Sequence, residues 1–261
     1  ADFLGGLAAR RTAPVAVVVV SQAAGFVVLG IAALLLPGRF YPVDVAWGVA
    51  AGVAGGIAIS ALYAALSVGR MGVVSPITAV VGASVPVALG LAFGQRPTPI
   101  VLAGIALAFV AVGLVSANAE TRRISIREPG LALALVSGAT IGLLYVFLAR
   151  GHADGGLALL ATTRLTSLVM LTGYALIRRD SLRPAAGGLP TILFAGVLDM
   201  LANVLYVVAS RHGLLPVVAV LTSLYPASTV ALARFVLHER LEALQWWGVA
   251  CATLGVALIA I

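Results

Sequence analysis

Lysine is absent from this chain of 261 residues, cysteine occurs once, and charged residues make up only 10% of the sequence. Soluble globular proteins carry about 25% charged residues, so this composition excludes an ordinary soluble domain. The lone Cys251 excludes an intrachain disulfide framework and a site built on several thiolates. Hydrophobic residues instead make up 62% of the chain, and the mean hydropathy is +1.14. These values predict an all-α polytopic membrane protein.

The net charge of +7 comes from arginine, since the chain has no lysine. Such a charge could indicate a nucleic-acid partner, but the arginines lie mostly in short gaps between apolar runs. Loop charge that orients helices is the better interpretation, and we expect no nucleic-acid partner. Counted by side of the membrane, ten arginines lie on one side and four on the other, which favours the first side as cytoplasmic.

A membrane-crossing helix needs about 20 mostly apolar residues. Windows of that kind lie at 13–36, 43–67, 72–93, 98–117, 130–149, 157–177, 189–209, 214–237 and 243–261. Residues 1–9 are also apolar and end at two arginines, as the last turns of a tenth helix cut off upstream would. A signal peptide, the competing interpretation, would need a basic start and a cleavage site.

Two hairpins within the chain resemble each other. Residues 69–116 match residues 213–260 at an offset of about 144, so that Gly69 pairs with Gly213 and Thr78 with Thr222. Because an odd number of crossings separates the copies, the second copy must be inverted relative to the first. We therefore predict a ten-helix inverted-repeat transporter with halves at 1–117 and 130–261 and a joining loop at 118–129. Such a chain needs no protein partner to complete its site.

The segment 238–260, HERLEALQWWGVACATLGVALIA, resembles the last helix and preceding loop of the EamA-type transporters of the drug/metabolite transporter superfamily. Residues 61–116, which contain ALSVGRMGVVSPI, resemble the third to fifth helices of that family, and residues 2–11 (DFLGGLAARR) resemble the end of its first. The resemblance implies two inverted five-helix repeats that move small metabolites, amino acids or drugs. It also implies cytoplasmic termini, whereas the arginine distribution puts the carboxyl terminus outside. Gln95 departs from the pattern, because the second repeat has Glu239 there.

Ionisable side chains inside a bilayer are costly, and each is a functional hypothesis. Asp199 lies about ten residues into its predicted helix, roughly 15 Å deep at 1.5 Å per residue. Asn203 and Tyr206 follow on the same helix face. This stripe could bind an ammonium or hydroxyl group or hold a coupling proton; a polar clasp between helices is the structural alternative. The first repeat has Gly55 and Gly56 in the equivalent place, which favours the functional interpretation.

Arg164 lies about two turns into its predicted helix and could pair with Asp199. Helical side chains lean toward their amino-terminal ends, however, which pulls these two groups apart in antiparallel helices, so snorkelling to the interface is an equal alternative. Ser60 and Tyr63 share a face of the helix predicted at 43–67. Tyr63 could face Tyr206 across the repeat axis, or either ring could belong to the core.

Two prolines interrupt predicted helices at matching places. Pro86 and Pro226 each remove a backbone donor, leaving the carbonyls of Gly82 and Thr222 without their usual partners. Such carbonyls need another donor at membrane depth, and the kinks give each hairpin a place to bend. We expect hinges there, although a purely structural kink is as good an interpretation.

Small residues recur every four positions along the helix predicted at 43–67, at Gly48, Gly52, Gly56 and Ser60. This stripe predicts close helix packing in preference to substrate contact. His152, His212 and His238 fall in gaps at no metal-ligand spacing and are expected to be exposed. The sequence predicts no metal, cofactor or phosphate-binding loop, so uphill transport would use an ion gradient or exchange.

Three functions compete. An intramembrane enzyme would need a nucleophile with a base or two close carboxylates, and neither pattern is present. A flippase, or an accessory subunit for a lipid-linked sugar, is the alternative that similar folds allow. We favour a secondary transporter in a bacterial plasma membrane, exporting small zwitterionic or cationic metabolites with amino acids the leading class. Its site would comprise Asp199, Asn203, Tyr206, Tyr63, Ser60, Arg164 and Thr222, with a proton or an exchange substrate as the coupling partner.

Overall fold

A computed structural model describes residues 1–35, 39–69, 71–115, 130–152, 154–155, 157–222 and 243–260. Nearly all of these residues are helical, as predicted. Five of the helices are long and apolar enough to cross a membrane, and the shorter apolar stretches Ile77–Ala92 and Pro99–Ala111 accompany them. The joining loop predicted at 118–129 and the hinge residue Pro226 lie outside the described residues.

The helices follow the predicted windows closely. Their bounds are α1 Asp2–Ala9, α2 Pro14–Leu35, α3 Pro42–Val68, α4 Met71–Ala92, α5 Pro99–Val115, α6 Leu131–Leu148, α7 Ala158–Arg178, α8 Leu189–His212, α9 Leu215–Thr222 and α11 Ala243–Ala260. Proline opens α2, α3 and α5, because a residue at the first helical position needs no amide donor. Each predicted window overlaps one of these helices, and α3, α4, α7 and α8 extend one to three residues beyond their windows.

Helices α3 and α8 end in the same way. Gly69 caps α3 with extended backbone, and its N–H donates to Ala65 O. Gly213 caps α8 with extended backbone, and its N–H donates to Ala209 O. These caps occupy equivalent positions of the two similar hairpins, so each hairpin begins from the same backbone geometry.

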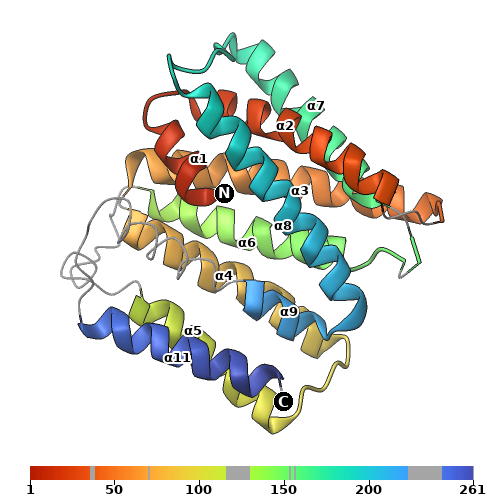
Figure 1. The fold of residues 1–261 in the computed structure, drawn as a ribbon, viewed down its shortest axis with the longest axis vertical. Helices are drawn as coiled ribbons and strands as arrows, with labels where there is room; N and C mark the ends of the chain where they lie inside the picture. Colours follow the sequence, from red (N-terminus) through yellow and green to blue (C-terminus); the bar gives the residue numbers. More distant parts are fainter. Residues whose placement is uncertain are drawn as a thin grey trace.

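The helices lie side by side in a stack (Figure 1). Helices α2 and α7 lie at one end of the stack, and α5 and α11 pack on each other at the opposite end. Between them α3 packs on both α6 and α7, α4 packs on α6, and α2 packs on α8. The middle of the molecule is therefore surrounded by α2, α3, α6, α7 and α8.

Glycines set the distance between α3 and α7. A Cβ atom at Gly48 would lie 2.7 Å from Leu159 O, and one at Gly52 would lie 2.6 Å from Thr163 O. Such separations leave no room for a side chain, so the backbones touch. Each step of four residues along α3 matches a step of four along α7, so the two helices run parallel. The prediction that this stripe packs helices is confirmed.

Two further crossings use the same device. On α8, a Cβ atom at Gly196 would overlap Ser21 O of α2. On α6, Cβ atoms at Gly138 and Gly142 would each lie 2.8 Å from a carbonyl oxygen of α4, that of Thr78 or that of Gly82. These two crossings therefore also bring helix backbones close together at glycine.

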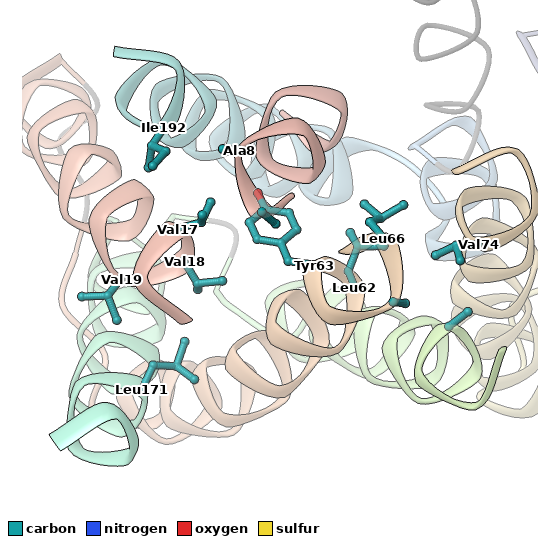
Figure 2. Packing of buried hydrophobic residues seen from close by; sticks show 13 residues of the cluster. Ala8, Val17, Val18, Val19, Leu62, Tyr63, Leu66, Val74, Leu171 and Ile192 are labelled. Atoms are coloured by element: carbon teal, nitrogen blue, oxygen red, sulfur yellow. The ribbon is translucent and has the colours of Figure 1, made fainter. Parts of the chain in front are cut away.

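Apolar side chains fill the space between α1, α2, α3 and α8 (Figure 2). The Tyr63 ring extends from α3 toward α1 and is only 2% exposed. A Cβ atom at Gly5 of α1 would overlap the Tyr63 hydroxyl group. The ring therefore fixes how closely α1 approaches α3.

The Gly196 crossing can be tested with one methyl group. We expect Gly196→Ala to destabilise the protein by about 1–3 kcal/mol, because overpacking forces the α2 and α8 backbones apart. The matched control is Gly30→Ala on α2, since a Cβ atom there meets nothing within 4 Å. Thermal unfolding in detergent measures both changes, and equal unfolding midpoints for the two variants would contradict the close crossing.

Candidate functional site

A cavity of about 250 Å³ lies in the middle of the molecule, among α2, α3, α6, α7, α8 and α9. Aliphatic side chains such as Leu62, Ile141, Leu144 and Leu160 form much of its wall. Its polar lining consists of Ser21, Gln22, Tyr63, Tyr145, Thr163, Arg164, Ser167, Asp199, Asn203 and Thr222. The cavity thus combines an apolar wall with a small group of polar side chains, the usual composition of a ligand site.

Arg164 and Asp199 form an ion pair in this cavity. The Arg164 Nη2 atom donates to Asp199 Oδ2, which joins α7 to α8. The Arg164 side chain is 9% exposed and the Asp199 side chain is 31% exposed, so the carboxylate faces the cavity more openly. The snorkelling alternative for Arg164 is therefore wrong. Side chains of antiparallel helices tilt away from each other, but the arginine side chain is long enough to reach Asp199.

Gln22 of α2 holds the other side of the guanidinium group. Arg164 Nη1 donates to Gln22 Oε1 at 2.8 Å. Ser167, one turn further along α7, lies with Oγ 3.1 Å from the same oxygen atom. Gln22 is 4% exposed and Ser167 is fully buried. The network ties α2, α7 and α8 together at one point of the cavity wall.

Asn203 lines the cavity one turn beyond Asp199, as the predicted stripe requires. Its Nδ2 atom donates to the Asp199 carbonyl oxygen at 2.8 Å. Among the described residues, Asp199 Oδ1 has no hydrogen-bond donor. The second carboxylate oxygen therefore keeps its acceptor capacity within the cavity that Asn203 also lines.

Two other predicted residues line the cavity and two do not. Tyr63 and Thr222 belong to the lining. Tyr206 instead points toward α6, where its ring stacks on Tyr145 at 4.4 Å and its hydroxyl group donates to Tyr145 O at 3.1 Å. Ser60 lies outside the lining, and its buried Oγ atom has no hydrogen-bond partner within the described structure. Tyr206 therefore supports Tyr145, which takes the cavity position.

Pro86 lies within α4, which continues through it to Ala92. The Gly82 carbonyl that loses its amide partner is directed at Gly142 of α6. The partner hinge residue, Pro226, follows the last described residue of α9, Thr222.

Gln22, Ser167 and Tyr145 were missed by the sequence interpretation. Gln22 Oε1 accepts hydrogen bonds from Arg164 and Ser167, on a helix more than 140 positions away, which no local spacing reveals. The available signal was chemical: an amide in the middle of the apolar helix α2 must find a polar partner at membrane depth.

A second polar cluster lies at one edge of the helix stack. We call Tyr41, Asp44, His152 and Asp154 the loop clasp. His152 donates from its backbone N–H to Asp44 Oδ1 at 3.2 Å, and its ring Nδ1 atom lies 2.8 Å from the same oxygen. The Tyr41 ring stacks on the His152 ring at 3.9 Å. The clasp thus joins the start of α3 to the segment between α6 and α7.

The Tyr41 hydroxyl group donates to Asp154 Oδ2 at 2.6 Å. This hydrogen bond holds the pKa of Asp154 below its usual value and raises the pKa of Tyr41. The lowered pKa of Asp154 gives stability that is present above the unfolded value of about 3.9 and is lost as the pH falls through the folded value. The raised pKa of Tyr41 gives stability that is present below about 10 and is lost as the pH rises through the folded value.

This hydrogen bond gives a pH prediction. We expect Tyr41→Phe to return the pKa of Asp154 toward its usual value, because the donor that stabilises the carboxylate is removed. An NMR titration of the Asp154 carboxyl carbon in the full chain measures the change. An Asp154 pKa that is the same in both proteins would contradict the assigned hydrogen bond.

The buried ion pair gives a stability prediction. Asp199→Asn leaves the buried Arg164 charge without its counter-ion, so we expect a loss of about 3 kcal/mol, the low end of the range for a broken buried pair. Arg164→Gln should cost less, because Asp199 is partly exposed. The double variant Arg164→Gln with Asp199→Asn should recover part of the loss in thermal unfolding. Strictly additive effects in this double-mutant cycle would show that the two groups do not interact.

The stacked apolar helices and the central polar cavity define a multi-pass membrane protein. Residues 128–261 match the model of the EamA-like transporter family. The chain therefore belongs to this family of membrane transporters, in the drug/metabolite transporter superfamily.

One similar solved structure extends the likeness across the whole chain. Its description reads only "Crystal structure of protein", and it superposes with a TM-score of 0.76 at 17% sequence identity. The match covers 99% of this chain and 93% of that one, so the two share a fold. Among curated proteins, no sequence matches the chain significantly.

Proposed function

We propose that the chain is a secondary transporter whose two inverted halves enclose one central substrate site. Gly52 of α3 crosses α7, and Gly196 of α8 crosses α2, at positions 144 residues apart in the sequence. The two helices of each crossing run in the same direction. The caps at Gly69 and Gly213 are also 144 residues apart. Exchanging the halves therefore maps one crossing onto the other, which supports an inverted repeat with five helices in each half.

The cavity supports a site shared between the halves. Helices α2 and α3 come from the first half, and α6, α7, α8 and α9 come from the second. Movement of one half against the other would open this cavity to alternate sides of the membrane. The glycine crossings favour such movement, because smooth surfaces without interlocking side chains can slide.

The size of the cavity supports a small substrate. Pockets for drug-sized ligands measure about 300–1,000 Å³, and this one measures about 250 Å³. A single amino acid fits that volume, whereas a lipid-linked sugar would need a much larger opening. The geometry therefore favours a metabolite transporter over a flippase.

We base the proposed substrate class on the ion pair between Arg164 and Asp199. In this proposal Asp199 Oδ1 accepts hydrogen bonds from a ligand ammonium group, and Arg164 donates to a ligand carboxylate. A zwitterion supplies both groups at once, and it replaces the internal ion pair with two new ones without adding net charge to a buried site. A simple amine would add a positive charge beside Arg164. We therefore favour zwitterionic metabolites, with amino acids first, exported across a bacterial plasma membrane.

Counterflow in proteoliposomes tests this function. We expect the wild type to exchange labelled neutral amino acids, and Asp199→Asn to reduce that exchange by at least about tenfold, because a lost charge-assisted hydrogen bond costs about 1.5–3 kcal/mol. The control is Asp180→Asn, the same substitution in an exposed loop. Both variants are measured at two pH values.

Each outcome has a clear meaning. Exchange by Asp199→Asn equal to that of the wild type, with the same pH dependence, would make Asp199 a packing residue. No exchange of any amino acid by the wild type would refute the proposed substrate class. Movement of a lipid-linked sugar by that same preparation would favour a flippase.

A further inference from the structure

Gln22 is the neutral member of the cavity network, and its surroundings are unusually well defined. Its Oε1 atom accepts from Arg164 Nη1 at 2.8 Å, and Ser167 Oγ lies 3.1 Å away. The residue is 4% exposed and lines the cavity. Its amide therefore faces a buried cation at the place where a ligand would bind.

Arg164 and Asp199 are the charged side chains among the described residues that line the cavity. Their charges cancel. Gln22 adds an acceptor for the guanidinium group without adding charge, so Arg164 stays oriented yet keeps its full positive charge. When a ligand ammonium group pairs with Asp199, Arg164 loses its counter-ion. The ligand carboxylate can then take the place of that counter-ion.

A carboxylate at position 22 would change this balance. It would form a charge-assisted hydrogen bond with Arg164, which is roughly twice as strong as the bond to a neutral amide. The carboxylate at position 22 would then neutralise Arg164, and it would repel a ligand carboxylate because both are negative. Asp199 would meanwhile be left to bind a cation alone.

We infer that Gln22 is a specificity-determining residue: its neutral amide positions Arg164 so that the site selects zwitterions and rejects amines. This inference rests on the proposed function, because it concerns the charge type of the substrate that the cavity transports. Gln22 acts through Arg164, so it is a positioning residue and its signature is a change in selectivity.

Equilibrium binding of two probes to the purified full chain tests the inference. Leucine carries both charged groups, and isoamylamine is leucine without its carboxylate. We expect the wild type to prefer leucine by at least about tenfold, and Gln22→Glu to reverse the preference, because like charges at close range disfavour binding and opposite charges favour it. If Gln22 had a merely structural role, its substitution would lower the affinities for both probes together.

Two further variants complete the test. Gln95→Glu makes the same chemical change between α4 and α5, outside the cavity lining, and should keep the wild-type preference. Gln22→Leu removes the acceptor without adding charge, so leucine affinity should fall about tenfold with no gain for isoamylamine. Gln22→Leu also keeps the inference testable should Gln22→Glu fail to fold.

The results separate this inference from the proposed function. Wild-type binding of leucine with an unchanged preference in Gln22→Glu, or in Gln22→Leu, would overturn the role of Gln22 alone. Binding of neither probe by the wild type would overturn the zwitterion proposal and this inference with it. A reversed preference in Gln22→Glu with an unchanged preference in Gln95→Glu would support both.

Discussion

The close approach of helix backbones at glycine is the constraint on which the site depends. Gly52 brings α3 against Thr163 O, the residue before Arg164, and Gly196 brings α8 against Ser21 O, the residue before Gln22. Asp199 follows Gly196 by three positions, which is nearly one helical turn. The two crossings therefore determine where the arginine, the amide and the carboxylate meet. A bulkier residue at either glycine would push the helices apart. It would therefore separate these side chains although their identities stay the same.

The polar network at the cavity wall joins three helices. Arg164 joins α7 to α8 through Asp199, within residues 130–261, and it joins α7 to α2 through Gln22, so the Gln22 bond connects the amino-terminal and carboxyl-terminal parts of the chain. The loop clasp adds a second link at the edge of the stack, where Asp44 of α3 binds His152 beyond α6. Polar contacts thus join the helices both at the edge of the stack and at its centre.

The helices were predictable because a long apolar segment satisfies its backbone hydrogen bonds in a membrane by forming a helix. Prolines at the first helical positions also indicated where several helices begin. Asp199 and Asn203 were also predictable, because polar groups at membrane depth share a helix face at a spacing of four. Gln22 and the Arg164–Asp199 pair were harder, since they depend on how three helices cross and on the reach of a long side chain. His152 is 41% exposed, as an edge residue should be, but its pairing with Asp44 joins segments 108 positions apart.

The most direct test of the account is a distance measurement between Arg164 and a bound ligand. Solid-state NMR on the full chain in lipid, with guanidino-labelled arginine and carboxylate-labelled leucine, detects a contact between the two labelled carbons. The account predicts that contact in the wild type and its loss in Arg164→Lys. A contact that persists in Arg164→Lys, or bound leucine without any arginine contact, would contradict recognition of the carboxylate by Arg164.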